Sequence, residues 1–387
     1  MNKIGIITSS CAKSGTYGCN YGAALQGYAL VRQLRDLGYE AYDVNYLSDY
    51  EYRPQQYSLL KRTWKRLGML TNLQLVRGKL DQIKNRDNLR RNFLVFENFV
   101  ADNNLTYAKG KFFTINELKQ ESEAFSAFIT GSDVVWNPYL HGGINDPGYF
   151  LDFAVDGVKR ISYAASFGVT LLPDESRQTL KSYLEKFDAV SVREKSGADL
   201  IKKETGMDVQ VVLDPTLLLA PQKYDDLVKE PKNLPNKYIA VYKFGDISHT
   251  EEKIRELSKK LNLPVVYIPS GKTTEYSVRY DVGPGEFIHI VRNAELVISD
   301  SFHCSVFCLI NHTPFLTFFR TVPKQGKDLN SRMIDLLAMV GLSDRIVKPG
   351  ESIDYDTLFT VDFAMADKKI EEMRKKSMTY LKKVLEG

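Results

Sequence analysis

The sequence predicts an α/β protein made of two Rossmann-like domains that face a common cleft. The chain has 387 residues, which is long for one domain and comfortable for two. Short apolar runs of strand length alternate with stretches of helical period, once before residue 218 and again after residue 237. Between the two sets lies a proline-rich stretch without a long apolar run, residues 219–236, which we interpret as a linker.

The first set opens with a βαβ unit. Residues 3–8 form an apolar run, and a loop rich in Ser, Gly and Asn follows it. A helix with leucines at helical spacing begins at Tyr21, and Gly38 is placed to end it. Residues 40–46 are the next strand. The loop lacks the Gly-x-Gly-x-x-Gly pattern, so a dinucleotide is not indicated.

Four further strands of the first set end in small or charged residues. Because ligands of parallel sheets bind at the carboxyl ends of the strands, these ends and the Asn20 loop predict the rim of a ligand cleft. Asp214 comes directly before a proline, and we interpret it as a turn residue. The strands are expected at residues 125–130, 160–165, 189–192 and 209–213, with a helix at residues 195–205 after the third.

The second set repeats the alternation. Its strands are expected at residues 238–242, 264–268, 296–298 and 315–318, and its helices at residues 251–261, 283–294, 304–310 and 330–340. The predicted organisation is a domain at 1–218 with a mainly helical, basic insertion at 47–110, a linker at 219–236, a domain at 237–361, and a terminal helix at 362–387 that packs back on the first domain. Two such domains around a cleft are the glycosyltransferase-B type of architecture.

The net charge of +4 is concentrated in one stretch. Residues 61–91 contain ten basic and two acidic residues, with apolar residues between them. The stretch is either a solvated helical face or a surface for anionic lipid head groups or a diphosphate-linked substrate. Nucleic acid is not expected, because no binding motif accompanies the charge. No signal peptide and no run of ~18 apolar residues is found, so we expect a cytoplasmic protein, peripheral at the inner membrane face if the stretch binds lipid.

The four cysteines do not indicate a metal site. Cys304 and Cys308 are one helical turn apart, but no CxxC or HxxxH pattern accompanies them. We expect small buried residues, reduced thiols and no metal.

Residues 295–318 contain the turn that is most informative about chemistry. A buried strand ends in Ser299-Asp300-Ser301-Phe302-His303, and an apolar helix follows. His303 therefore falls in the first turn of a helix, where backbone N–H groups and the helix dipole favour an anion. Histidine also titrates near neutrality, which suits a proton donor. The alternative is a hydrogen-bonded structural histidine.

Other strand-end residues have two interpretations each. The guanidinium of Arg193 is suited to a carboxylate or phosphate, or it pairs with Glu194. Asp133 is placed to orient or deprotonate a hydroxyl, or it is a turn residue. The hydroxyl groups of Ser299 and Ser301 contact a ligand or cap the helix.

Five motifs in this order resemble the polysaccharide pyruvyl transferase family, over roughly residues 5–340. The resemblance implies a glycosyltransferase-B-like fold and phosphoenolpyruvate as the donor substrate, with no further cofactor. It also implies transfer of pyruvate to sugar hydroxyls, often as a cyclic ketal, in a cell-surface polysaccharide. The motifs are Asn20-Tyr21-Gly22-Ala23-Ala24-Leu25-Gln26, Gly131-Ser132-Asp133-Val134-Val135-Trp136-Asn137, Ser191-Val192-Arg193-Glu194, Leu213-Asp214-Pro215-Thr216 and Ser299-Asp300-Ser301-Phe302-His303.

The resemblance also assigns roles to residues. His303 matches the proposed acid, and Arg193 matches an arginine that holds the donor. The position of Asp133 at a strand end, and not the resemblance, makes it the second expected catalytic residue. Some members have Arg-Leu-His where this chain has Ser301-Phe302-His303, so one cation of the donor site is missing. Either Lys243, Arg279 or Arg320 replaces it, or the donor is held differently. The donor-binding set is then Arg193, Ser299, Ser301 and Lys243, and the acceptor-binding set is Asn20, Tyr21, Ser132 and Trp136.

The expected partners follow from this assignment. They are phosphoenolpyruvate, a galactose- or mannose-type glycan that is free or linked to a lipid diphosphate, and an anionic membrane surface through residues 61–91. Two alternatives remain: a nucleotide-sugar-dependent glycosyltransferase of the same fold, and a non-catalytic carbohydrate-binding assembly protein.

Overall fold

The structure is a computed structural model that describes residues 2–9, 20–48, 86–140, 142–244, 248–270, 282–320 and 329–387. Most of the basic stretch, residues 61–85, lies outside the described residues, and so does Arg279.

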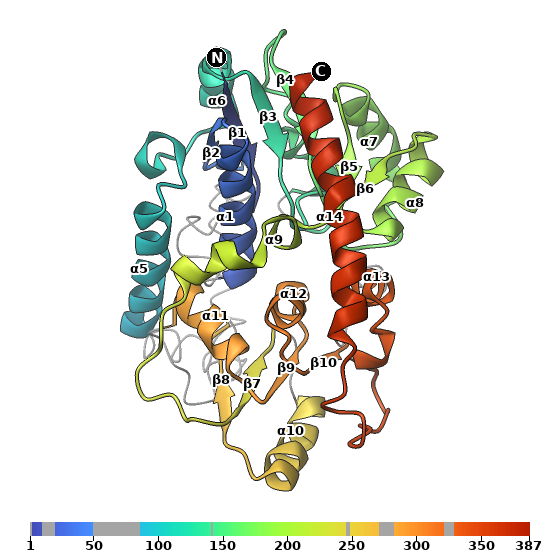
Figure 1. The fold of residues 1–387 in the computed structure, drawn as a ribbon. Coiled ribbons are helices and arrows are strands. Elements are labelled where there is room, and N and C mark those ends of the chain that lie inside the picture. Colours follow the sequence, from blue (N-terminus) through green and yellow to red (C-terminus); the bar gives the residue numbers. More distant parts are fainter. Residues whose placement is uncertain are drawn as a thin grey trace, which may run out of the picture.

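The amino-terminal half is built around a parallel sheet with the strand order β2-β1-β3-β4 (Figure 1). Parallel bridges from Ile161 to Ala189 and from Ala165 to Val192 connect this sheet to the parallel pair β5-β6. The strands are β1 (Lys3–Ile7), β2 (Glu40–Asp43), β3 (Ala127–Thr130), β4 (Lys159–Ser162), β5 (Ser191–Val192) and β6 (Gln210–Val211).

The carboxy-terminal half contains a second parallel sheet, ordered β11-β10-β9-β7-β8. The four residues of β7 and of β9 are all buried, as expected for strands covered on both faces. The α/β class with two parallel Rossmann-like sheets is thereby confirmed. The strands are β7 (Ile239–Tyr242), β8 (Val265–Tyr267), β9 (Leu296–Ser299), β10 (Phe315–Phe318) and β11 (Ile346–Val347).

Helices cover the sheets in both halves. Most of them match stretches of helical period, whereas α6, α7 and α9 were not predicted from the sequence. The described helices are α1 (Tyr21–Asp36), α5 (Arg86–Asp102), α6 (Ile115–Glu121), α7 (Arg177–Leu184), α8 (Lys195–Thr205), α9 (Pro215–Leu218), α10 (Ser248–Leu261), α11 (Pro284–Arg292), α12 (Phe302–Asn311), α13 (Ser331–Val340) and α14 (Phe363–Glu386).

Contacts of α1 and α14 hold the two halves together. At the start of α1, the Tyr21 hydroxyl donates to the carbonyl of Val282 over 3.1 Å, and the Tyr21 ring stacks on Phe287 with centroids 4.7 Å apart. Helix α14 runs along both halves (Figure 1), and its Tyr380 hydroxyl donates to the carbonyl of Ser162 over 3.2 Å. The terminal helix therefore contacts the amino-terminal sheet directly.

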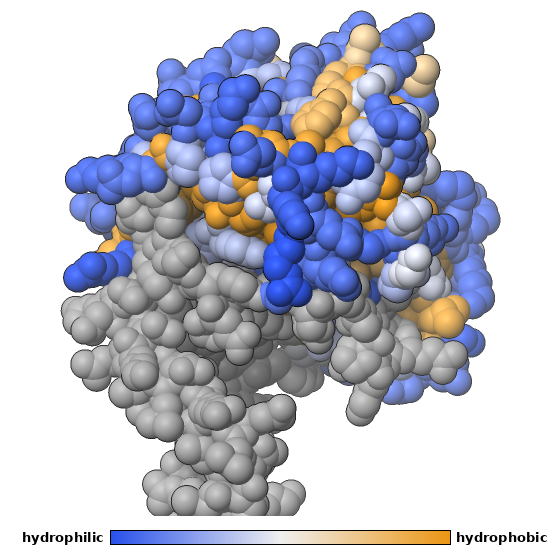
Figure 2. Space-filling model, turned by 90° about the horizontal axis from the view of Figure 1, so that it is seen from below, coloured by the Kyte–Doolittle hydropathy of each residue, from blue (hydrophilic) through white to orange (hydrophobic). Residues whose placement is uncertain are grey.

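The coloured part of the face seen from below is mainly polar. Figure 2, which views the molecule from below, shows hydrophilic residues over most of the coloured surface, with hydrophobic residues visible between them. Among the helices that the structure describes, none is both long enough and apolar enough to span a membrane.

Candidate active site

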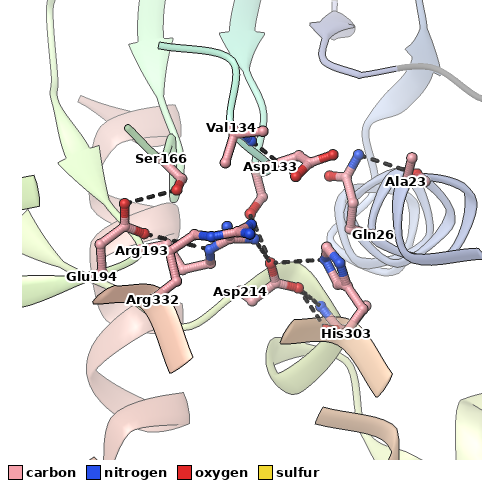
Figure 3. Close-up of polar contacts among 12 residues, drawn as sticks. Ala23, Gln26, Asp133, Val134, Ser166, Arg193, Glu194, Asp214, His303 and Arg332 are labelled. Atoms are coloured by element: carbon pink, nitrogen blue, oxygen red, sulfur yellow. Dashed lines mark hydrogen bonds and ion pairs between the residues drawn. The ribbon is translucent and has the colours of Figure 1, made fainter. Parts of the chain in front are cut away.

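Polar side chains from both halves converge where the carboxyl ends of β3, β5 and β6 meet the first turn of α12 (Figure 3). Asp133, Arg193 and Asp214 come from the first half, and His303 comes from the second. Because strands of a parallel sheet end at one edge, residues distant in sequence are brought into one site. His303, Arg193 and Asp133, which the sequence predicts as site residues, therefore lie close together.

Asp214 is the centre of this group. Its Oδ2 accepts hydrogen bonds from Ser132 Oγ at 2.7 Å and Arg193 Nη1 at 2.8 Å, and lies 3.4 Å from His303 Nε2. Its Oδ1 accepts from the backbone N–H and the hydroxyl of Thr216. Burial alone would raise the pKa of Asp214, but His303, Arg193 and Thr216 hold it far below its usual range. Asp214 is therefore an ionised carboxylate that joins the two halves.

His303 lies against helix α1. The Ser301 hydroxyl caps α12 by accepting from the Cys304 N–H at 3.5 Å, which places His303 in the first turn. A Cβ atom built on Gly22 would lie 2.2 Å from His303 Nδ1, so the ring occupies space that any other residue at position 22 would fill. The side chain is 7% exposed, and Nε2 forms no hydrogen bond despite its proximity to Asp214. The ring is thus held in place, while its Nε2 keeps its hydrogen-bonding capacity unused.

Arg193 has several partners and unused donors. Its guanidinium carbon lies 4.1 Å from the centre of the Phe302 ring, and its Nε lies 3.5 Å from Glu194 Oε2. Burial alone would lower the pKa of Arg193, but the charges of Asp214 and Glu194 raise it by more than burial lowers it. The pKa is therefore above its usual value, and the side chain stays charged. Its Nε and Nη2 form no hydrogen bond. Arg193 thus forms an ion pair with Glu194 and still has N–H groups that donate no hydrogen bond.

Asp133 has an unusual backbone conformation. Its φ is +77°, a region that costs a non-glycine residue on the order of 1 kcal/mol or more and recurs at functional sites. Its Oδ1 accepts from the Val134 N–H at 2.9 Å. Burial would raise the pKa of Asp133, but the charges of His303, Arg193 and Arg332 lower it. Asp133 is therefore a buried carboxylate that can accept a proton.

Arg332 in the first turn of α13 also belongs to this group, although the sequence pattern did not predict it. Arg332 is 6% exposed, and its Nε donates to the carbonyl of Leu329 at 3.3 Å. Its Cδ lies 3.5 Å from the position of a Cβ built on Gly168. Burial, together with the charges of Arg193 and Arg320, lowers the pKa of Arg332 to about 9.

The remaining residues of the expected donor set have partners within the protein. Ser299 Oγ donates to the carbonyl of Tyr242 at 2.6 Å and accepts from the Ser301 N–H at 3.0 Å. Lys243 donates to the Thr250 hydroxyl and lies 5.8 Å from the centre of the Phe318 ring. Of the candidate replacement cations, Arg320 is paired with Asp300 at 3.3 Å.

The residues of the expected acceptor set lie in different settings. Asn20 caps α1 by accepting from the N–H groups of Gly22 and Ala23 at 3.0 and 3.3 Å. Ser132 belongs to the Asp214 network. Tyr21 and Trp136 are fully buried, and the Trp136 indole donates to the carbonyl of Tyr149 at 3.0 Å. The structure thus brings Ser132 to His303 and places the two aromatic rings in the core.

A cavity of about 340 Å³ adjoins the group between the two halves. Its charged lining residues are Arg193, Glu194, Lys195, Asp214, Arg332 and Asp335. Its apolar lining comes from Phe302, from Val211, Leu213 and Leu217, and from residues of α13 and α14 such as Met339 and Met373. Within the described residues, no cluster of His, Cys, Asp or Glu has the arrangement of a metal site, and Cys304 and Cys308 are both buried.

Solved structures match this chain at very low sequence identity. A putative UDP-N-acetylglucosamine 2-epimerase from Listeria monocytogenes is 10% identical, with 95% of this chain and 94% of that chain covered and a TM-score of 0.50. The UDP-GlcNAc 2-epimerase of Methanocaldococcus jannaschii is 12% identical over 96% of this chain and 99% of that chain, at 0.46. MurG from Acinetobacter baumannii is 8% identical with both chains covered completely, at 0.43. The first of these supports a glycosyltransferase-B-like fold and nothing more specific.

The sequence comparisons address the family itself. No curated protein sequence matches the chain. The family model described as polysaccharide pyruvyl transferase matches residues 20–318, a range that contains Asp133, Arg193, Asp214 and His303. This match covers most of the chain, and the protein therefore belongs to the polysaccharide pyruvyl transferase family.

Proposed function

We propose that this protein transfers pyruvate from phosphoenolpyruvate to a pair of hydroxyl groups on a sugar, forming a ketal in a cell-surface polysaccharide or its lipid-linked precursor. Family membership supports pyruvyl transfer and a polysaccharide substrate. The observation that supports the mechanism is the buried group in which Asp214 contacts both His303 and Arg193 at the start of α12.

The reaction needs an acid, a base and an anion site. A proton added to the methylene carbon of phosphoenolpyruvate leaves an oxocarbenium-like centre on the neighbouring carbon. A sugar hydroxyl forms a C–O bond to that centre and gives up its proton. The C–O bond to phosphate then breaks, phosphate leaves with the electron pair, and the second hydroxyl closes the ketal as it loses its proton.

His303 is the proposed acid. Histidine is the side chain used most often as a general acid, and the ionised Asp214 and the backbone of Gly22 fix the orientation of this ring. Asp214 acts here as a positioning residue, because its oxygens are already engaged by Ser132, Arg193 and Thr216.

Asp133 is the proposed base for the sugar hydroxyl. Its lowered pKa keeps it ionised at neutral pH, so it can accept the proton that the hydroxyl loses. Arg193 supplies the donor-binding charge through the hydrogen-bond donors that the protein leaves unused. The first N–H groups of α12 add a second attraction for the phosphate.

The acceptor and the place of reaction belong to the same proposal. We infer a galactose- or mannose-type acceptor, and a reaction on the inner membrane face where a lipid-linked acceptor is found. The excess of basic residues in residues 61–91 supports this location, because such stretches bind anionic lipid.

A turnover assay tests the function. Phosphoenolpyruvate with a galactose- or mannose-containing glycan should release one phosphate per ketal formed, measured by phosphate detection and mass spectrometry. His303→Gln should lower the rate by about 10²- to 10⁴-fold, as for the loss of a general acid. His312→Gln is the matched control, since His312 ends the same helix and its side chain is 52% exposed.

Two alternative functions give different results in the same experiment. Binding of a uridine or guanosine diphosphate sugar without any phosphate release from phosphoenolpyruvate would indicate a nucleotide-sugar-dependent glycosyltransferase. Glycan binding with no turnover of either donor would indicate a non-catalytic carbohydrate-binding protein. Undiminished activity of His303→Gln would show that His303 is not the general acid.

A further inference from the structure

Three arginines are buried among the residues that the structure describes, and one of them lacks a carboxylate partner. Arg193 contacts Asp214 and Glu194. Arg345 contacts Asp344 through Nε at 2.9 Å and Nη2 at 2.5 Å, and also donates to two carbonyls. Arg332 is as buried as these two, but its one hydrogen bond is to the carbonyl of Leu329.

The terminal nitrogens of Arg332 are therefore unused. In the described part of the chain, no carboxylate lies within 4.0 Å of its guanidinium, and neither Nη1 nor Nη2 forms a hydrogen bond. Asp133 and Glu194 are close enough to act on its charge but do not contact it. A buried cation without an anion is costly, and a strongly perturbed charged group in a cavity is a candidate for contact with a ligand.

The position of Arg332 suggests which ligand this is. It lines the cavity of about 340 Å³ together with Arg193, Asp214 and Phe302, the residue that precedes His303. It also acts electrostatically on Asp133, as His303 and Arg193 do. An anion that contacts Arg332 in this cavity would thus lie next to Arg193, the arginine assigned to the donor.

We propose that Arg332 binds an oxyanion of the donor substrate, either the phosphate or the carboxylate, and that it is a donor-specificity residue. The identity of the donor rests on the proposed function. Phosphoenolpyruvate carries two anionic groups, and Arg193 and Arg332 offer two planar guanidinium groups, each able to hold one oxyanion with paired hydrogen bonds. The crowding of Arg332 by Arg193 and Arg320 is then relieved when the donor binds.

The test separates a binding role from a structural one. Arg332→Met should raise the KM for phosphoenolpyruvate by about 10- to 100-fold, the usual effect of losing a charge-assisted pair. Arg332→Lys should recover part of this loss because it restores the charge without the fork. The melting temperature of the ligand-free Arg332→Met protein should equal or exceed that of the wild type, because the variant removes an unpaired buried charge.

Arg345→Met is the matched control. It removes a buried arginine that already has its carboxylate, so it should lower the melting temperature and leave the KM for phosphoenolpyruvate unchanged. A lower melting temperature and an unchanged KM in Arg332→Met would show a structural arginine and would overturn the proposal.

A binding experiment keeps this proposal distinct from the proposed function. Inorganic phosphate and pyruvate are added separately to wild type and to Arg332→Met, and thermal stabilisation is measured. Loss of stabilisation by either anion in the variant supports the oxyanion site, even if phosphoenolpyruvate is not turned over, and it identifies which group Arg332 holds. Equal stabilisation of both proteins overturns the site. A wild type that neither responds to these anions nor consumes phosphoenolpyruvate overturns both proposals.

Discussion

The backbone of Gly22 lies directly against the imidazole ring of His303. A Cβ built on Gly22 would approach Nδ1 to 2.2 Å and Cγ to 2.5 Å. Contacts below 3.0 Å cannot be accommodated without movement, and here the obstacle is a ring held on its other side by Asp214. The first turn of α1 in one half therefore determines where a histidine of the other half can lie.

Gly22→Ala should displace His303 and lower activity. A shift of the ring by about 1 Å can cost about 10²-fold in rate, and overpacking at a buried site costs about 1–3 kcal/mol of unfolding free energy. The pyruvyl transfer rate and urea unfolding measure the two effects. Gly27→Ala is the control on the same helix, since a Cβ there meets only Asp43 Oδ2 at 3.8 Å and should keep activity. Equal activity of the two variants would show that the Gly22 contact does not position the ring.

Ser301→Ala should affect stability more than donor binding. The Ser301 hydroxyl accepts from the Cys304 N–H and caps α12, so its loss should cost about 0.5–2 kcal/mol. Ser301→Gly should cost only about a few tenths of a kcal/mol of unfolding free energy, because glycine is tolerated at an N-cap. Chemical denaturation measures both costs. A KM for phosphoenolpyruvate that rises tenfold in either variant would instead assign the hydroxyl to the donor.

The sequence predicted the fold because its physical signals are local. The strands β3, β7 and β9 are buried on both faces and therefore appear as uninterrupted apolar runs. Helix α6 was missed because its seven residues, Ile115–Glu121, contain only one buried side chain and give little periodicity. The capping box between Thr114 and Glu117 is a signal that would have located it.

The site was predicted in part, for the same reason. His303, Arg193 and Asp133 follow apolar strands, so a rule about strand ends finds them. Asp214 obeys the same rule, but the following proline made it look like a turn residue; it both caps α9 and contacts His303. Arg332 follows no strand directly, and a single arginine on an amphipathic helix is normally solvated. Only the packing of α13 against the amino-terminal half shows that it is buried.

The basic stretch at residues 61–91 gives a prediction that depends on charge alone. The protein should sediment with vesicles containing anionic lipid and not with neutral vesicles, and binding should weaken as salt is raised. Replacing Lys61, Arg62, Lys65 and Arg66 by glutamine should reduce sedimentation while turnover of a soluble glycan is retained. Equal binding to neutral and anionic vesicles would exclude an electrostatic membrane contact.

Asp214→Asn should destabilise the protein and lower its activity, and the effect on stability should depend on pH. Removing one partner of a buried ion pair costs about 3–5 kcal/mol, because Arg193 is left less compensated and His303 loses its orienting charge. The pKa of Asp214 is lower in the folded than in the unfolded chain, so the unfolded state binds more protons and stability rises with pH between the two values.

The contribution of Asp214 to the free energy of unfolding is thus complete above its ordinary pKa of about 4, and it diminishes as pH falls below that value. Urea unfolding of wild type and Asp214→Asn should show a large difference at neutral pH that narrows below about pH 4. A difference that stays constant down to the lowest pH at which the wild type folds would mean that the charge of Asp214 is not what stabilises the contact between the halves.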